Sequence, residues 1–243
     1  MLKLSIITIN FNNKPGLEKT IKSVLEQTFI DFEYIVIDGG STDGSVDIIN
    51  DFQSKIKYWV SEKDSGIYNA MNKGIEKAKG EYCFFLNSGD VFLDNKVVQD
   101  VFFIANHSDI IYGNLLFTYV SGAKRKGVMP KTLTFKHMIQ DTLWHPVSFI
   151  KTTLFDIIGK FDEKHPIVAD YDFFLKAILI HKVTTQKINR TIAIFRQDGI
   201  SASPNNKTKI LEERNKVQMK YFTKDKIDSA LKTTFKKFCF PVS

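Results

Sequence analysis

The chain has 243 residues, 43% of them hydrophobic and 13% aromatic, so it can bury one sizeable core. We expect one domain, with or without an appended segment. The two cysteines, Cys83 and Cys239, are too few for a disulfide framework or a cysteine metal cluster. Cys83 lies inside an apolar run, which favours a reduced, cytoplasmic protein. No run approaches the roughly 20 apolar residues of a membrane-spanning helix, and no classical signal peptide is evident.

The formal net charge of +7 is concentrated near the C-terminus. From residue 207 onward there are ten Lys or Arg against four Asp or Glu, a balance of +6, and the rest of the chain is close to neutral. A nucleic-acid-binding protein usually presents a basic domain or stripe. The distribution excludes a uniformly basic nucleic-acid binder, and we expect no nucleic-acid partner.

The first half of the chain alternates between strand and helix patterns. Short links join these segments, which is typical of an α/β fold with a parallel sheet and right-handed crossovers. The predicted strands cover residues 4–9, 32–37, 56–60 and 82–86, and the predicted helices cover residues 15–27, a segment after residue 44, and 65–78.

The second half is predicted to be mixed, with antiparallel strands. Strand patterns cover residues 110–120, 147–150, 183–188 and 191–195, and helical patterns cover residues 97–104, 131–139, 153–158 and 170–180. The basic cluster at residues 124–126 is expected at a turn, where it is either solvated or able to meet an acceptor phosphate. No linker is evident before about residue 201.

The segment from residue 81 to 92 is the expected centre of the sheet. Its apolar run is too short for a helix and rich in aromatic residues, which predicts a strand buried on both faces. The run ends at Asn87-Ser88-Gly89-Asp90. Ligands bind at the carboxyl ends of parallel strands, so Asp90 is placed to hold a cation and, through it, a diphosphate. An equally simple alternative is that Asp90 closes a turn.

Polar clusters follow three of the predicted parallel strands. They are expected to meet at one edge of the sheet and favour a nucleotide-binding cleft, although turn chemistry alone explains any single cluster. The clusters are Asn10 with Asn12, Asp38 with Ser41 and Asp43, and Asn87 with Asp90. Neither G-x-x-x-x-G-K-[ST] nor a G-x-G-x-x-G after the first strand is present, which argues against a P-loop kinase and a nicotinamide-dependent dehydrogenase.

Five motifs in order resemble the family 2 glycosyltransferases: SIITINFNN, FEYIVIDGGSTDGS, SEKDSGIYNAMNKGI, GEYCFFLNSGD and VADYDFFL. The resemblance covers roughly residues 3–200 and is nearest to bacterial members that build capsule, exopolysaccharide or lipopolysaccharide. It implies a GT-A fold over residues 1–200, with a nucleotide-sugar half (1–93), an acceptor half (94–200) and a helical tail (201–243). It also implies an inverting transfer of a hexosyl or N-acetylhexosaminyl group from a UDP-linked sugar to a saccharide or lipid-linked acceptor.

The resemblance assigns the donor residues position by position. Asn10 and Phe11 correspond to the base pocket, and Asp38 lies where the family contacts uracil and ribose. Gly39 replaces a second aspartate of the family motif, which weakens the case for uracil selectivity. Asp64, Asn72 and Ser88 fall in segments that contact the nucleotide-sugar. From the residues alone, Asp64 also suits a helix cap and Asn72 a solvated helix position.

The family's metal motif is reduced here to one carboxylate, Asp90, which implies a divalent cation, Mn²⁺ or Mg²⁺, held also by the diphosphate and water. Asp170 corresponds to the catalytic base, with Ala169 in place of the preceding glutamate of the family. Without the resemblance, the residues favour a helix cap as the role of Asp170. Asp172 is expected to point elsewhere. His145 is either an acceptor-site residue or a structural one.

The C-terminal tail is predicted to contact the inner face of the cell membrane. As a helix, it places Ile227, Leu231, Phe235 and Phe238 on one stripe among several lysines, which suits an interfacial helix. The alternative is that this stripe packs on the enzyme itself, or that the tail is disordered.

Two other functions fit the composition and the strand-end clusters. A sugar-phosphate nucleotidyltransferase also uses an α/β nucleotide fold and a divalent ion, but usually has a glycine-rich basic loop where this chain has Asn10-Phe11-Asn12-Asn13. A non-catalytic nucleotide-sugar binder would explain the reduced metal motif.

Overall fold

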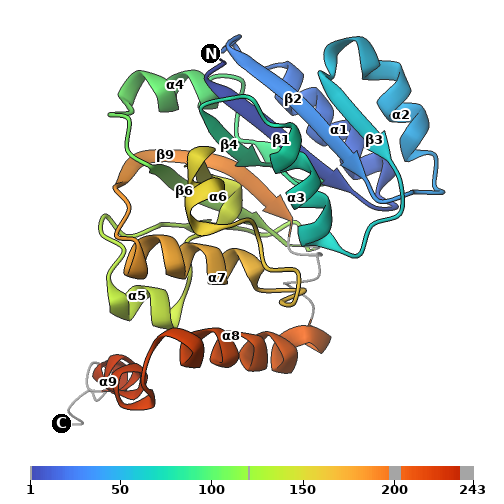
Figure 1. Ribbon diagram of the computed structural model, residues 1–243. Helices are drawn as coiled ribbons and strands as arrows, with labels where there is room; N and C mark the ends of the chain where they lie inside the picture. The colour runs from blue at the N-terminus through green and yellow to red at the C-terminus, as the bar shows by residue number, and fades with distance from the viewer. Residues whose placement is uncertain (1, 120, 197–203, 236–243) are drawn as a thin grey trace.

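The computed structural model describes residues 2–119, 121–196 and 204–235 (Figure 1). Its described strands form one nine-stranded sheet in the order β3-β2-β1-β4-β8-β6-β9-β5, with β7 paired to β6. Helices cover both faces of this sheet. The predicted α/β class with a GT-A-type sheet is confirmed.

Four parallel strands form the N-terminal half of the sheet: β1 (Leu4–Asn10), β2 (Phe32–Asp38), β3 (Tyr58–Ser61) and β4 (Tyr82–Phe85). They alternate with α1 (Lys14–Leu25), α2 (Ser45–Phe52), the short η1 (Gln53–Lys55) and α3 (Ile67–Lys77). Right-handed crossovers put α1 and α2 on one face, and the return step to β4 puts α3 on the other. Figure 1 shows α3 in front of the strands and α1 behind them.

The C-terminal half extends this sheet with antiparallel pairings. β8 (Ser148–Lys151) lies antiparallel between β4 and β6 (Ile110–Thr118), and β9 (Thr185–Arg196) runs parallel to β6. The other elements here are β5 (Val91–Phe92), β7 (Lys124–Gly127), α4 (Val97–Ile104), α5 (Phe135–Gln140), η2 (His145–Val147), α6 (Thr153–Ile158), and α7 (Ala169–Leu175) with its π-helical continuation Lys176–Ile180.

Two secondary-structure predictions in this half are wrong. Residues 124–126, expected at a turn, lie in β7, an edge strand whose exposed basic side chains disfavour pairing with another chain. The two strands expected at residues 183–188 and 191–195 are one strand, β9. The pairing of β9 with β6 shifts register near Asn114. Such an irregularity leaves the polar residues in the middle of β9 unpaired with β6 while the strand continues on both sides of them. The two-residue β5 was not predicted.

The strand β4 is buried on both faces, as its apolar sequence predicted. Phe84 stacks on Phe149 at 4.5 Å between ring centroids, while Phe85 contacts Phe155 and Phe161 on the opposite face. Successive side chains of a strand alternate between faces, so β4 joins both helical layers to the sheet. Burying each phenylalanine contributes about 1.5–3 kcal/mol.

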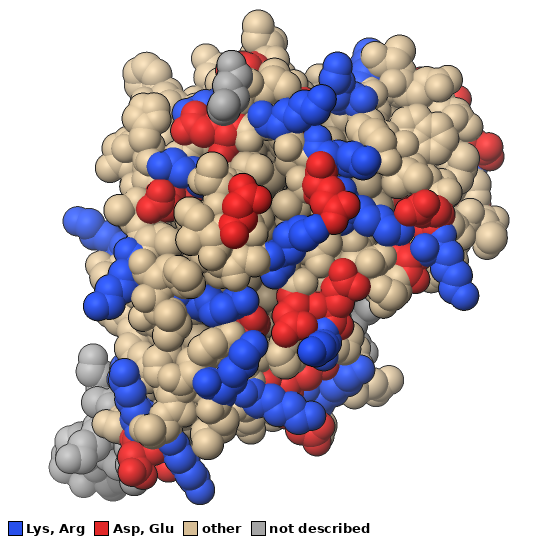
Figure 2. Space-filling view, viewed as in Figure 1, with Lys and Arg blue, Asp and Glu red and all other residues tan. Residues whose placement is uncertain are grey.

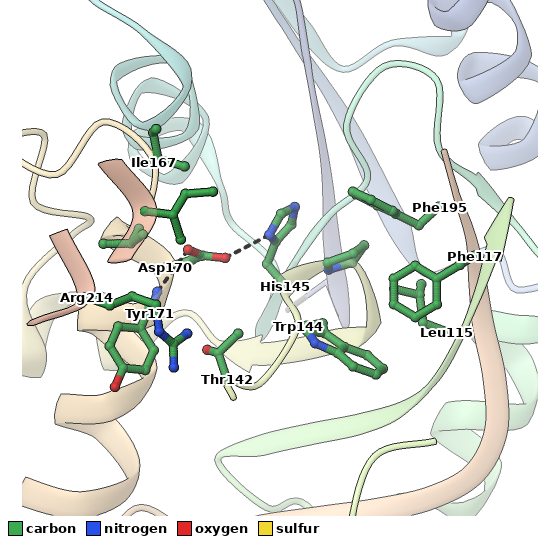
Figure 3. Close-up of a pocket in the computed structure, with 13 residues that line it drawn as sticks. Leu115, Phe117, Thr142, Trp144, His145, Ile167, Asp170, Tyr171, Phe195 and Arg214 are labelled. Atoms are coloured by element: carbon green, nitrogen blue, oxygen red, sulfur yellow. Dashed lines mark hydrogen bonds and ion pairs between the residues drawn. The ribbon is translucent and has the colours of Figure 1, made fainter. Parts of the chain in front are cut away.

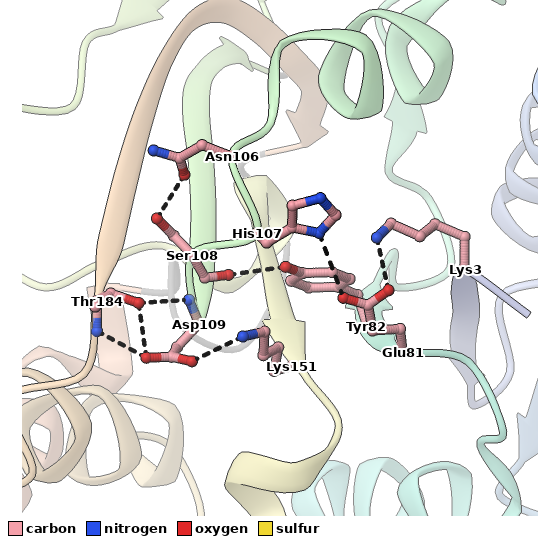
Figure 4. Close-up of polar contacts among 9 residues, drawn as sticks. All are labelled: Lys3, Glu81, Tyr82, Asn106, His107, Ser108, Asp109, Lys151 and Thr184. Carbon is pink, nitrogen blue, oxygen red and sulfur yellow. Dashed lines mark hydrogen bonds and ion pairs between the residues drawn. The ribbon is translucent and has the colours of Figure 1, made fainter. Parts of the chain in front are cut away.

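A polar cluster ties strands together at the sheet end where β4 begins (Figure 4). Asp109, just before β6, accepts hydrogen bonds from the Thr184 amide (2.9 Å) and hydroxyl (2.7 Å) and pairs with Lys151 at 3.1 Å. Beside it, Lys3 pairs with Glu81, and the Tyr82 hydroxyl donates to the Ser108 carbonyl. This cluster lies at the opposite end of β4 from Asn87 and Asp90, and therefore serves the fold.

We expect Asp109→Ala to lower the free energy of unfolding by about 1–2 kcal/mol at pH 7, since three partners lose an acceptor. Burial alone would raise the pKa of Asp109, but Thr184 and Lys151 outweigh it and hold the pKa below 3.8. Its stabilisation is therefore present above the unfolded-state pKa and disappears as the pH falls through the folded-state value.

Thermal unfolding should show the variant melting about 2–8 °C below wild type at pH 7, with a smaller gap near pH 3. Asp51→Ala, which removes an exposed carboxylate from α2, is the matched control. A gap that is equally large at both pH values would contradict the assigned role of the Asp109 charge.

The chain from residue 204 folds back onto the C-terminal half of the sheet. α8 (Lys207–Tyr221) runs beside α7, and α9 (Lys224–Phe235) packs on α5 (Figure 1). Ile227 and Ala230 of α9 are buried against Ile139. The prediction that Ile227 faces a membrane is thus wrong in this structure, because the apolar side chains of α5 cover it. Leu231 stays 41% exposed, while the side chain of Phe235 and all of Phe238 lie outside the described residues.

The surface viewed in Figure 2 carries both signs of charge. On this face, Lys and Arg side chains alternate with Asp and Glu side chains over α8 and over the helices in front of the sheet, and no large patch is exclusively basic. Among the described helices, none combines the length and hydropathy needed to cross a bilayer.

Candidate active site

The carboxyl ends of β1 and β2 form a buried hydrogen-bond cluster. The Asn10 amide donates to Asp38 at 2.7 Å, and the second Asp38 oxygen accepts from the Ser41 amide and the Ser61 hydroxyl. Burial acts to raise the pKa of Asp38, but the Ser41, Ser61 and Asn10 donors outweigh it, so the pKa lies below its ordinary value. Asp38 is fully buried, and its hydrogen bond with Asn10 fixes the orientation of the Asn10 side chain. Asp38 is not among the described residues that line the neighbouring cavity.

Gly39 lies close to the side chain of Asp64. A Cβ atom at position 39 would lie 2.5 Å from the Asp64 carboxylate oxygen and 3.2 Å from the Phe11 ring. An aspartate there, as in the family motif, would require the Asp64 side chain to move. Asp64 also accepts a hydrogen bond from the Gly66 amide at 2.9 Å in the turn before α3. The N-cap of α3 is Gly66 and has no side-chain cap, so the helix-cap alternative for Asp64 is wrong.

A cavity of about 390 Å³ opens at this edge of the sheet, which we call the larger pocket. Phe11 is 64% exposed, which leaves its ring accessible to a ligand. Asn10 is almost fully buried, and its Oδ1 atom has no hydrogen-bond partner among the described residues. The predicted site residues that this pocket gathers are Asn10, Phe11, Asp64, Ser88, Asp90, His145 and Asp170.

Asn72, by contrast, does not line either pocket among the described residues. Its amide nitrogen donates to the Phe161 carbonyl at 2.9 Å, and its amide oxygen accepts from the Phe161 amide at 3.0 Å. It is 8% exposed, so the alternative of a solvated helix residue is wrong. Asn72 connects α3 to the segment that precedes α7.

The carboxylate of Asp170 lies at the start of α7, held on both oxygens. Oδ1 accepts from the Tyr68 hydroxyl (2.8 Å) and the Tyr171 amide (2.9 Å), and Oδ2 lies 3.1 Å from His145 Nδ1 (Figure 3). His145 Nε2 lies 3.2 Å from the Asn87 amide nitrogen, so the imidazole joins Asn87 to Asp170. Asp172 points away, toward the Tyr221 hydroxyl of α8, as expected.

These partners keep Asp170 ionised. Burial would raise the pKa of its carboxyl, but the hydrogen bond and charge of His145, followed by the Tyr68 hydroxyl and Tyr171 amide, lower it below 3.8. Burial and the neighbouring Asp170 charge raise the pKa of Tyr68 well above its ordinary value, so Tyr68 remains a donor. The Asp170 side chain is still 15% exposed, and that accessible part faces the cavities.

A second cavity of about 260 Å³, the smaller pocket, adjoins the larger one. The two share His145, Ile167, Asp170 and Phe195. Figure 3 shows Asp170, Tyr171 and Arg214 on one side of the smaller pocket and Phe117, Leu115 and Phe195 on the other, with His145 between. Asp170 thus lies where two cavities meet, which is the geometry needed for a proton acceptor between two substrates.

Several residues of these pockets were not predicted from sequence. Tyr68 is one tyrosine on an amphipathic helix, and Arg196 is one arginine at the end of β9, so neither had a local signal. Arg196 lines the larger pocket, and its amide donates to Asp90 at 3.2 Å. Ile210 and Arg214 come from α8, in the segment expected to be a tail.

Asp90 is the candidate cation ligand at the end of β4. Asp90 is 4% exposed and lines the larger pocket, yet no group of three or more His, Cys, Asp or Glu side chains is arranged for a metal within the described ranges. One carboxylate fits a cation only if the remaining oxygen ligands come from a bound diphosphate and water.

Four parallel strands extended by an antiparallel set, with two cavities meeting at one carboxylate, define a GT-A glycosyltransferase fold. S. aureus TarS 1–349 in complex with UDP superposes with a TM-score of 0.69 at 21% identity, over 98% of this chain and 72% of that one. The mannosyltransferase PcManGT from Pyrobaculum calidifontis, in complex with GDP-Man and Mn²⁺, gives 0.68 at 12% identity, over 91% and 65%.

The chain belongs to glycosyl transferase family 2. Residues 5–160 match that family. The uncharacterized glycosyltransferase Rv1514c of Mycobacterium tuberculosis H37Rv is 36% identical over 186 residues, which span 75% of this chain and 71% of that protein.

Proposed function

We propose that this glycosyltransferase moves a hexosyl or N-acetylhexosaminyl group from a UDP-sugar to a saccharide or lipid-linked acceptor during bacterial surface polysaccharide synthesis, with inversion at the anomeric carbon. The observation that supports this most is the position of Asp170 at the junction of the two pockets. A donor in the larger pocket and an acceptor in the smaller one would both reach this carboxylate.

The reaction is a single displacement. The acceptor hydroxyl oxygen forms a bond to C1 of the sugar, the bond from C1 to the diphosphate oxygen breaks, and Asp170 takes the hydroxyl proton. Its low pKa keeps it in the form that accepts a proton throughout the neutral range. His145 and Tyr68 hold the carboxylate from both sides, so its orientation is fixed before the acceptor arrives.

The larger pocket suits a nucleoside diphosphate. The exposed ring of Phe11 offers a stacking surface for a base. The UDP complex of TarS supports this choice of nucleotide. Ser88 and Asp64 line the same pocket and are proposed to contact the donor.

Asp90 is proposed as the single protein ligand of a Mn²⁺ or Mg²⁺ ion that arrives with the donor. When bound, this ion offsets the negative charge that the departing diphosphate gathers. Arg196, in the same pocket, brings a second positive charge to that region. The Mn²⁺ complex of PcManGT supports the cation.

Action at the inner face of the cell membrane remains a proposal that rests on the basic C-terminal segment. The burial of Ile227 means that contact would have to involve the lysines of α8 and α9 and residues outside the described part.

A donor panel tests the proposed function directly. Incubation with UDP- and GDP-sugars and Mn²⁺ should raise the melting temperature selectively with UDP-sugars, and the best of these should be hydrolysed slowly without acceptor. No stabilisation by any UDP-sugar would reject the proposed donor. Release of pyrophosphate from a nucleoside triphosphate and a sugar 1-phosphate would instead indicate a nucleotidyltransferase.

A further inference from the structure

Arg214 of α8 is the cationic residue among the described residues that line the smaller pocket. The other lining residues are mostly aromatic or apolar, including Phe117, Trp144 and Ile210. The pocket also contains the carboxylate of Asp170, which would repel an anionic ligand. The partly buried guanidinium of Arg214 is therefore the group that determines whether a negatively charged acceptor can enter this pocket.

The guanidinium is held in one position by its surroundings. It stacks on the Tyr171 ring at 3.9 Å from the centroid, and Nη2 donates to the carbonyls of Ile139 (3.3 Å) and Asp141 (2.9 Å). Because it is already ordered, binding a ligand would require little further loss of side-chain entropy.

The helix that presents Arg214 is itself anchored around α7. Glu213 is buried and accepts from the amides of Ile167 and Val168, and Gln218 donates to the Tyr171 hydroxyl at 2.8 Å. These contacts fix α8 against the residues that flank Asp170. Arg214 and the proposed base therefore keep a constant separation.

Two donor nitrogens of Arg214 remain available to an anionic ligand. Nη2 is used by two carbonyls, and both paired faces of a guanidinium include Nη2, so a two-point contact with either a carboxylate or a phosphate is blocked. Nε and Nη1 make no hydrogen bond to other described residues. Each can donate to one oxygen of a phosphate, whose negative charge the guanidinium attracts.

We propose that the smaller pocket binds an acceptor saccharide that bears a phosphate group, with Arg214 as the residue that selects it. This inference rests on the proposed function and names the acceptor class for that same site. The sugar ring would lie against Trp144, whose flat apolar face suits its C–H surface, and its phosphate would face Arg214.

Trp144 provides a binding signal inside this pocket. The chain has two tryptophans, so a Trp59→Phe background leaves Trp144 as the reporter. In the presence of saturating UDP, glucose 1-phosphate and methyl glucoside are each titrated into the protein and their affinities compared. The same comparison is made between glucose 1-phosphate esterified with a dodecyl chain and dodecyl glucoside. Tighter binding of the dodecyl ester would assign the phosphate to a lipid-linked acceptor, and equal binding would assign it to a soluble saccharide phosphate.

Arg214→Gln should weaken both phosphorylated ligands by about 10-fold or more and leave the neutral glucosides unchanged. Arg214→Lys keeps a cation and should restore part of the affinity, and Lys216→Gln, an exposed change on the same helix, should have no effect. Melting curves check that each variant is folded.

The proposal is overturned if wild type does not prefer the phosphorylated ligands, or if Arg214→Gln binds them as tightly as wild type does. Because the measurement requires no sugar transfer, its failure is distinct from failure of the donor panel, which would reject the proposed function itself.

Discussion

Asp170→Asn is expected to reduce sugar transfer by on the order of 10²- to 10⁴-fold while leaving donor binding nearly unchanged. The amide preserves the shape of the side chain but cannot take a proton from the acceptor hydroxyl. Donor affinity should be retained because other residues of the larger pocket, Asn10 at the end of β1 and Phe11 just after it, are unchanged. Transfer rates with a responsive UDP-sugar, together with its dissociation constant, measure the two quantities separately.

The matched control for this variant is Asp172→Asn, two residues along the same helix. Asp172 accepts a hydrogen bond from the Tyr221 hydroxyl and pairs with Lys176, away from both pockets. An asparagine there keeps one acceptor, so transfer should stay within a few-fold of wild type when compared on folded protein. Wild-type rates in the Asp170 variant, or equal losses in the two variants, would remove Asp170 from the proposed mechanism.

The pH dependence of transfer gives a second test of the same residue. Because the pKa of Asp170 is held below 3.8, its base form persists as the pH falls through the range in which an ordinary aspartate begins to protonate. The acid limb of the rate profile attributable to this group should therefore lie below pH 4, provided that the protein is still folded there.

Asp90→Ala is expected to weaken donor binding in Mn²⁺ by on the order of 10- to 100-fold and to make the remaining activity insensitive to chelator. The reason is that Asp90 is the proposed cation ligand among the carboxylates that line the larger pocket in the described part of the chain, the others being Asp64 and Asp170. Isothermal titration with UDP, with and without Mn²⁺, measures the coupling between metal and nucleotide.

Asp51→Ala serves as a control for the loss of one negative charge far from the pocket. Wild-type activity that survives exhaustive treatment with EDTA would contradict the proposed metal site. In that case Arg196, in the same pocket, becomes the candidate for balancing the diphosphate charge.

Local sequence determined the parallel half of the sheet and one edge of the site. The alternation of short apolar strands with amphipathic helices defined β1 to β4, because strand burial and helix amphipathicity are read from neighbouring residues. Parallel strands bring their carboxyl ends to one edge, so the grouping of Asn10, Ser88 and Asp90 followed from their positions after strands. Asp170 required the family resemblance, since its local pattern favoured a helix cap.

Side-chain direction was decided by tertiary packing. Asp38 and Asn72 have the same polar character as the pocket residues, yet both turn toward protein partners, Asp38 toward Asn10 and Asn72 toward Phe161. Gly39 looked like a lost carboxylate, and the structure shows that Asp64 occupies the space such a side chain would need.

The second pocket depended entirely on long-range contacts. Tyr68 meets Asp170 from 102 residues away, and Arg214 reaches the smaller pocket from a segment that was predicted to be a helical tail at the membrane. The local sequence of this segment does not say which surface of the protein α8 packs against. That choice was made by the buried contacts of Glu213 and Gln218 with the residues around α7, where polar groups removed from water need partners that only the folded chain provides.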